Sequence, residues 1–74
     1  MMAALPSVHY RKVVKAFEAM GWNKVRQKGD HIIMVKEGHH ATLSIPAHNP
    51  VAKGTLRSLI RSAHLTIEEF TEKL

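Results

Sequence analysis

The chain has 74 residues, no cysteine and a net charge of +5 at neutral pH. A chain of this length forms one domain with a modest core, so we expect residues 1–74 to fold as a single unit. The absence of cysteine excludes disulfide bonds, thiolate zinc sites and cysteine nucleophiles. No apolar run approaches membrane-spanning length and the N-terminus lacks a signal-peptide pattern, so we expect a cytoplasmic protein.

The positive charge is unevenly distributed along the chain. Half of the acidic residues, Glu68, Glu69 and Glu72, lie close to the C-terminus, whereas ten Lys or Arg face three acids before residue 66. Such a balance favours an anionic partner, which would be a nucleic acid, an acidic protein or a membrane surface. A basic surface that serves only solubility is the alternative.

The first predicted element is a helix over residues 8–20. Its apolar residues share one helical face at i, i+3, i+4 and i+7, and they are Tyr10, Val13, Val14 and Phe17. Ser7 is the expected N-cap, and Gly21 suits the left-handed position that ends a helix.

Three short strands are predicted next, over residues 22–28, 31–36 and 41–46. The middle strand is apolar on both sides, which is typical of a central strand. Turns at residues 29–30 and 37–40 would join the three strands into an antiparallel meander.

The predicted second helix covers residues 55–64, with Gly54 or Thr55 as its cap. Its apolar face consists of Leu56, Leu59, Ile60 and Ala63. Just before it, Lys53 adds a positive charge to the exposed backbone N–H groups of the first turn, which together could bind a phosphate. An ordinary capped helix is the alternative interpretation.

The C-terminal segment contains a start signal for a short third helix. Thr66 and Glu69 have the spacing of a capping box, and Leu65 and Phe70 have the spacing of a hydrophobic staple. The resulting order, α-β-β-β-α with a short C-terminal helix, predicts an α+β fold with a three-stranded antiparallel sheet and helices on one face. The other face of the sheet would remain open for a partner.

His31 follows a Gly-Asp turn at the start of the central strand, on the same side as Ile33 and Val35. A structural histidine, facing solvent or the rim of the core, is one interpretation. Catalysis is the other, because alternation places Lys24, Arg26 and Lys28 together on one side of the preceding strand and a phosphate could be held near the imidazole. Histidine can act as general acid or base at neutral pH without a metal. A histidine beside bound phosphate would suffice to remove the proton of a ribose 2′-hydroxyl, so that the oxygen attacks its own phosphodiester.

Metal binding is the competing interpretation of the six histidines. His39 and His40 are adjacent and would point to opposite faces of a strand, while His9, His48 and His64 follow no ligand spacing. We therefore expect no metal and no other cofactor.

Three motifs taken together resemble the HicA family of small toxins, the RNA-cleaving halves of HicA–HicB toxin–antitoxin pairs. They are Arg-Gln-Lys-Gly-x-His at residues 26–31, Pro-x-His at residues 46–48 and KGTLRSLIR at residues 53–61. The resemblance spans about residues 10–72. It implies a double-stranded-RNA-binding-like fold, a type II toxin that cleaves mRNA as an endoribonuclease, and an antitoxin that covers the active histidine.

The resemblance places the single essential histidine of the family, in its Gly-Ser-His motif, at His31. Arg26, Lys28 and Lys53 would position phosphate, and we include Gly29 and Arg57 among the expected RNA-binding residues. The donor of the second proton is not identified by the sequence; His48, Lys28 and water are the options.

This chain departs from the family pattern at two positions. Asp30 replaces the usual serine; it could repel a phosphate, stabilise the imidazolium of His31 or weaken the toxin. His64 replaces a glycine at the end of the second helix, where we expect a strained cap with positive φ. A non-catalytic RNA-binding module of the same fold is the second functional hypothesis, and a basic interaction protein without a nucleic-acid role is the third.

Overall fold

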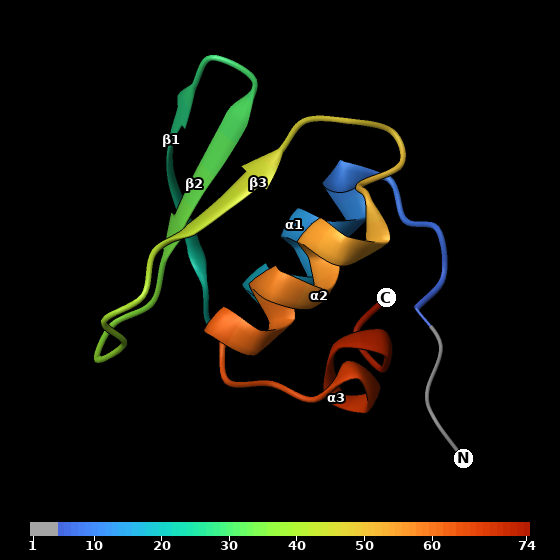
Figure 1. Ribbon diagram of the computed structural model, residues 1–74. Helices are drawn as coiled ribbons and strands as arrows, with labels where there is room; N and C mark the ends of the chain where they lie inside the picture. The colour runs from blue at the N-terminus through green and yellow to red at the C-terminus, as the bar shows by residue number, and fades with distance from the viewer. Residues whose placement is uncertain (1–4) are drawn as a thin grey trace.

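The computed structural model describes residues 5–74 (Figure 1). In chain order, the elements are α1 (Tyr10–Ala19), β1 (Asn23–Lys28), β2 (His31–Val35), β3 (Leu43–Pro46), α2 (Lys53–Ser62) and α3 (Ile67–Thr71). This order confirms the predicted fold. Residues 1–4 lie outside the described part of the chain. They include the start of the N-terminal stretch that is predicted to lack a signal peptide. In the part that is described, no helix is both long and apolar enough to span a membrane.

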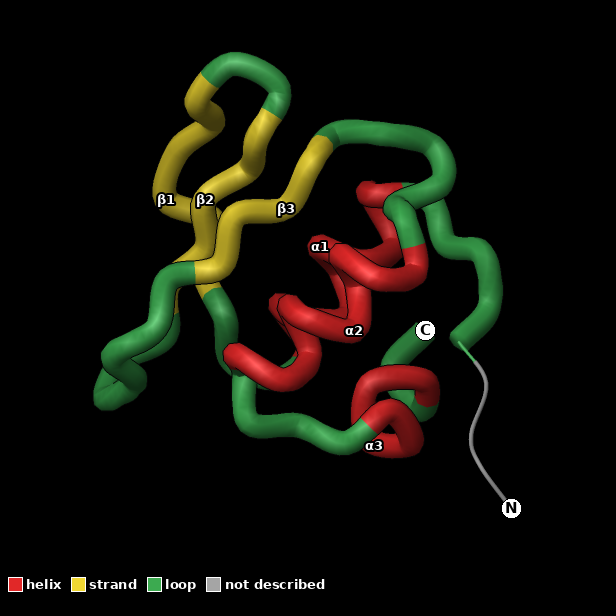
Figure 2. Tube along the Cα trace, in the orientation of Figure 1, coloured by secondary structure: helices red, strands yellow, loops and turns green. Residues whose placement is uncertain are grey.

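The sheet has the order β1-β2-β3, and both pairs of neighbouring strands are antiparallel. Helices α1 and α2 pack against the same face of this sheet, and α3 contacts both helices at the far end of the layer (Figures 1 and 2). On β2, Ile32 and Met34 are buried against the helices, whereas Ile33 and Val35 are only partly buried and His31 is exposed. The described chain therefore leaves the second face of the sheet uncovered, as predicted.

One hydrophobic core lies between the sheet and the helices. Met34, Leu43 and Ile45 from the strands are fully buried in it. Phe17 of α1 lies at its centre, with ring centroids 6.3 Å from Trp22 and 5.1 Å from Phe70. Aromatic pairs at these distances add about 0.5–1.5 kcal/mol each beyond the area they bury. The core thus joins α1 to the C-terminal helix as well as to the sheet.

Helix α1 begins two residues later than predicted, and its N-cap is His9 instead of Ser7. The His9 imidazole accepts a hydrogen bond from the backbone N–H of Arg11 through Nδ1, at 3.2 Å. Val8 precedes the helix and is only 4% exposed. Burial of Val8 in the core anchors the chain just before the helix, and Ser7 lies too far upstream of Tyr10 to cap it.

Two helices end in the left-handed conformation that the sequence predicts. Gly21 follows α1 with φ of 96°, and His64 follows α2 with φ of 59°. After α2, the N–H of His64 donates to Arg61 O and that of Leu65 donates to Ile60 O, at 3.0 and 3.1 Å. This pair of hydrogen bonds is a Schellman motif, and it satisfies carbonyls that the helix itself leaves unpaired.

Helix α3 has the predicted capping box. The Thr66 hydroxyl accepts from the backbone N–H of Glu69 at 3.0 Å, and the Glu69 carboxylate accepts from the backbone N–H of Thr66 at 2.8 Å. Phe70 is fully buried and Leu65 packs partly against the same core. The short helix is therefore fixed at its start by polar groups and along its length by one aromatic side chain.

Candidate active site on the open face of the sheet

His31 opens β2 at the end of the sheet where the β1–β2 turn lies. It is paired with Lys28 on β1 and with Pro46 on β3. Its side chain is 48% exposed and lies on the open face, because residues 31, 33 and 35 alternate with the buried Ile32 and Met34. The imidazole can therefore be reached by a large polyanion without any movement of the core.

Two cations share this face with His31, and a third that was expected there does not. Arg26 pairs with Ile33 and Lys28 with His31, so both lie on the open face. Lys24 pairs with the buried Met34, because a β-bulge at Val25 shifts the register between Lys24 and Arg26. The prediction that Lys24, Arg26 and Lys28 share one side is thus wrong for Lys24, since one inserted residue reverses the alternation.

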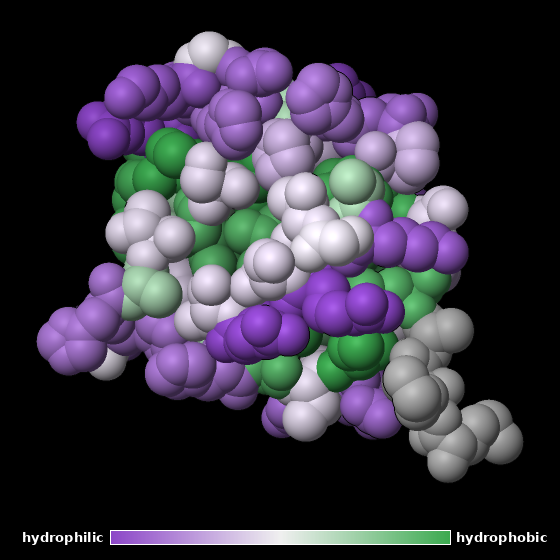
Figure 3. Space-filling model, in the orientation of Figure 1, coloured by the Kyte–Doolittle hydropathy of each residue, from purple (hydrophilic) through white to green (hydrophobic). Residues whose placement is uncertain are grey.

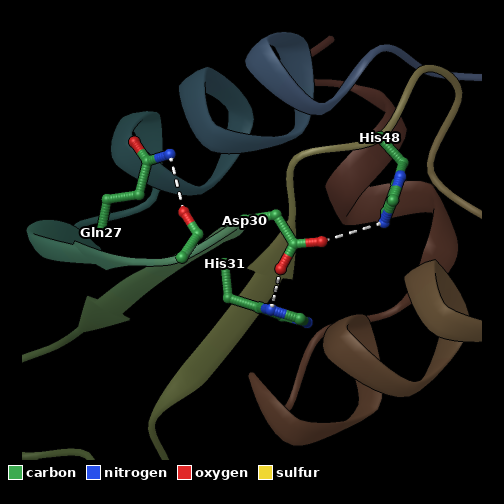
Figure 4. Close-up of polar contacts among 5 residues, drawn as sticks. Gln27, Asp30, His31 and His48 are labelled. Carbon is green, nitrogen blue, oxygen red and sulfur yellow. Dashed lines mark hydrogen bonds and ion pairs between the residues drawn. The ribbon is translucent and has the colours of Figure 1, made fainter.

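The turn between β1 and β2 shapes the surface next to His31. Gly29 has φ of 59°, and no atom beyond its two neighbouring residues lies within 4 Å of the position a Cβ would take. The Gln27 amide donates to the Gly29 carbonyl at 3.2 Å and holds the turn from the helix side of β1 (Figure 4). The peptide backbone of the turn is consequently open to a large ligand.

Asp30 contacts two histidines with one carboxylate (Figure 4). Its Oδ1 lies 3.0 Å from His31 Nδ1, and its Oδ2 lies 3.5 Å from His48 Nε2. All three side chains are about half to two-thirds exposed, with 63% for Asp30 and 64% for His48. Exposed ion pairs of this kind add little to stability, so their consequence is the orientation of the rings. We call Asp30, His31 and His48 the Asp30 cluster.

The backbone brings the two halves of the Asp30 cluster together. The N–H of Ala47 donates to the carbonyl oxygen of Asp30 at 2.6 Å, directly beyond the His31–Pro46 pair. The chain after β3 then crosses to the start of α2 with His48 in this crossing (Figure 2). Sequence reasoning named His48 only as one option for the second proton donor. The shared contact depends on the register of β2 and β3, which no local motif reveals.

Lys53 and Arg57 lie on α2, in the helical layer. The helix begins at Lys53 and its N-cap is Ala52, which makes no side-chain capping bond, so the prediction of a cap at Gly54 or Thr55 is wrong. Both cations are exposed and one helical turn apart. No hydrogen bond or ion pair of the described residues joins either to the Asp30 cluster.

Hydrophilic side chains form two groups in the space-filling view (Figure 3). They gather at the edge where the β1–β2 turn and the segment after β3 lie, and a second band crosses the molecule over α2. By their positions in the fold, His31, Arg26 and Lys28 belong to the open face of the sheet, whereas Lys53 and Arg57 belong to α2. The structure thus divides the predicted RNA-binding residues into two basic surfaces.

Three of the other four histidines have local structural contacts. His9 caps α1, and His39 packs its ring against Trp22 and His64, with centroids 4.9 and 4.8 Å away. His39 Nε2 also lies 3.0 Å from the carbonyl oxygen of Ser62 at the end of α2. Among residues 5–74, no three His, Cys, Asp or Glu side chains are grouped so that they could hold a metal ion.

Comparison with known proteins identifies the family of this chain. The family model described as "HicA toxin of bacterial toxin-antitoxin" matches residues 10–65, which include the whole candidate site. The chain belongs to the HicA toxin family. As such it is a toxin of a bacterial toxin–antitoxin system.

A solved structure shares the fold of this HicA toxin. It is a chain of a "Toxin-Antitoxin complex from Streptococcus pneumoniae", 36% identical in sequence, with a TM-score of 0.68. The similarity covers 81% of this toxin and 100% of that chain. No curated protein sequence matches the toxin. The family match ends before α3, so the capped C-terminal helix lies outside the matched segment.

Proposed function

We propose that this HicA toxin is a metal-independent endoribonuclease that cleaves mRNA in the bacterial cytoplasm, with His31 as its proton-transfer group and residues 1–74 as one domain. The observation that carries the proposal is the position of His31. It is exposed on the open face of the sheet, beside two cationic side chains, and Asp30 contacts one of its ring nitrogens. Membership of a family whose toxins are generally ribonucleases agrees with this assignment.

The chemistry follows from the protonation of the His31 ring. An ionised carboxylate only accepts hydrogen bonds, so the neutral ring facing Asp30 carries its proton on Nδ1. Nε2 then has a free lone pair, which can remove the proton of a ribose 2′-hydroxyl. The oxygen so formed attacks the adjacent phosphorus atom, and transesterification breaks the chain without a metal ion.

Arg26 and Lys28 are the residues that hold the phosphate over His31. They share its face of the sheet, and their charges oppose the negative charge that develops on the phosphate oxygens during attack. Gly29 lets the RNA backbone approach the turn, because it places no side chain there. Lys53 and Arg57 bind a more distant part of the RNA from α2.

The partner of the toxin is a HicB-like antitoxin protein. Its binding surface would cover the open face of the sheet around His31, because occlusion of that histidine stops cleavage. The positive charge of the toxin favours an antitoxin surface that offers acidic groups, which accelerates association. The match to a chain of a toxin–antitoxin complex supports this proposal.

A non-catalytic RNA-binding module is the second candidate. The observation that favours it is the basic surface of α2, an element that does not carry His31, where Lys53, Arg57 and Arg61 follow one another at intervals of one turn. Such a helix can bind phosphates by charge alone. The first candidate cleaves RNA through His31, whereas the second binds RNA without cleaving it.

The decisive experiment measures cleavage of single-stranded RNA by the purified toxin and by His31→Ala, both in excess EDTA. His40→Ala serves as a matched control, because His40 is an exposed histidine in the turn between β2 and β3, at the opposite end of that hairpin. We expect the wild type and the control to cut and His31→Ala to bind RNA without cutting. Binding without cutting by all three proteins would favour the RNA-binding module or a toxin disarmed by Asp30.

A further inference from the structure

We propose that His48 is the general acid that protonates the leaving 5′-oxygen, and that Asp30 is a positioning residue that holds His31 and His48 for opposite proton transfers. This inference rests on the proposed ribonuclease function and deepens it. It assigns the second proton donor, and it gives a role to the aspartate that stands where serine is usual in the family.

The geometry begins with the two ring contacts of one carboxylate. Asp30 Oδ1 lies 3.0 Å from His31 Nδ1 and Asp30 Oδ2 lies 3.5 Å from His48 Nε2. The Ala47–Asp30 backbone bond of 2.6 Å fixes the segment that carries His48 against the turn that carries Asp30. The backbone therefore holds the two imidazoles close to the same carboxylate, while both rings remain exposed to solvent.

The sheet order places the groups around His31 on different sides. Lys28 lies on β1 and His48 follows β3, so they flank β2 from opposite directions. A phosphodiester above His31 would thus meet a lysine on one side and an imidazole on the other. This arrangement favours His48 over Lys28 as the acid, because Lys28 is placed beside the base and its ammonium group suits charge stabilisation.

The two histidines must begin the reaction in different protonation states. Neutral His31 donates Nδ1–H to Asp30 and presents the lone pair of Nε2. Protonated His48 directs Nε2–H toward the other carboxylate oxygen and presents Nδ1–H. One aspartate then balances one imidazolium, and each ring offers its free nitrogen to the substrate.

The proposed step balances in protons and bonds. His31 Nε2 takes the 2′-hydroxyl proton as the 2′-oxygen forms its bond to phosphorus. The bond between phosphorus and the 5′-oxygen breaks, and that oxygen takes the proton from His48 Nδ1. The products are a 2′,3′-cyclic phosphate and a 5′-hydroxyl, with His31 protonated and His48 neutral. Exchange with water restores both rings.

A leaving-group experiment tests the role of His48. The probes are an oligoribonucleotide and the same oligonucleotide with sulfur in place of the bridging 5′-oxygen at the cleaved bond. A thiolate leaves without protonation because thiols are far more acidic than alcohols. We expect His48→Ala to lose about 10²–10⁴-fold in kcat on the normal RNA, the usual contribution of a general acid, but to cut the sulfur substrate nearly as fast as wild type.

The controls separate the possible failures. His31→Ala should be inactive on both substrates, and His40→Ala should be active on both. An equal loss on both substrates for His48→Ala would overturn the acid role, as would no loss on either. If the wild type cuts neither substrate, the ribonuclease proposal itself fails. His48→Gln, which keeps a polar side chain of similar length, repeats the test should the alanine variant be unfolded by circular dichroism.

The role of Asp30 is tested by the direction of two changes. A merely repulsive aspartate would, when replaced by Asn, give tighter RNA binding and faster cleavage together. A positioning aspartate gives a different result, because the amide no longer accepts from both rings. We expect Asp30→Asn to lower kcat by on the order of tenfold or more while RNA affinity is unchanged or tighter. A rise in kcat would overturn this role.

Discussion

The β-bulge in β1 allows a test of the proposed RNA surface with three similar cations. Arg26 and Lys28 lie on the face of the sheet that carries His31, whereas Lys24, only two residues from Arg26, lies on the helix face. We therefore expect the double replacement of Arg26 and Lys28 by Ala to weaken RNA binding, and Lys24→Ala to leave it nearly unchanged. If only the net charge of the protein mattered, each of the three replacements would weaken RNA binding by a similar amount.

The size of the effect follows from the number of phosphates contacted. Each contact with single-stranded RNA gives a slope of about −0.7 in log affinity against log salt, which corresponds to about fivefold in affinity at about 0.1 M salt. If Arg26 and Lys28 each hold one phosphate, the double variant should bind about 25-fold more weakly, and its slope should be less steep by about 1.4. Lys24→Ala should retain the wild-type slope.

Fluorescence anisotropy of a labelled single-stranded RNA, titrated at several salt concentrations, measures both quantities. His31→Ala is the suitable background, because it binds without cutting under the proposed function. Equal losses for Lys24→Ala and for each single variant of Arg26 and Lys28 would refute the reasoning. RNA binding would then follow total charge, and the open face of the sheet would have no special role.

Three further predictions concern stability, measured by urea denaturation. Thr66→Ala removes one side of the capping box and should lower the free energy of unfolding by about 1 kcal/mol; no change would show that α3 is held by packing alone. Phe70→Ala opens a cavity beside Phe17 and should cost about 3–5 kcal/mol, enough to threaten folding of so small a chain; a loss below that range would mean that the core can collapse around the site. His64→Gly relieves a side chain at φ of 59° and should raise stability by up to about 1 kcal/mol, because the strain relieved exceeds the added freedom of glycine; lower stability would show that packing of His64 on His39 dominates.

Local patterns were sufficient to predict the fold. The i, i+3, i+4 spacing of apolar residues predicted the faces of both long helices, and the capping box at Thr66 located α3. Helix starts were harder to predict. His9 serves as a cap in a position usually filled by Ser, Thr, Asp or Asn, and α2 begins without a side-chain cap at all. Both starts depend on how the preceding segment packs, and local preference does not encode that packing.

The candidate site was predictable where it depends on alternation within one strand, and it was not predictable where it depends on a bulge or on pairing between strands. The position of His31 on the open face follows from its alternation with Ile32 and Met34 within a single strand. The bulge at Val25 breaks such alternation without any signal in composition, so the side of Lys24 was predicted wrongly. The contact of Asp30 with His48 joins residues from separate segments, and it requires the register between β2 and β3.

Identification of the RNA ends produced by cleavage tests the central claim most directly. Mass spectrometry of the fragments made by the toxin in EDTA should show a 2′,3′-cyclic phosphate on one side of the cut and a 5′-hydroxyl on the other. The same RNA with a 2′-deoxyribose at the cleaved position should be bound and left intact. Fragments with a 3′-hydroxyl and a 5′-phosphate, or cleavage of the deoxy substrate, would contradict attack by the 2′-oxygen and with it the role assigned to His31.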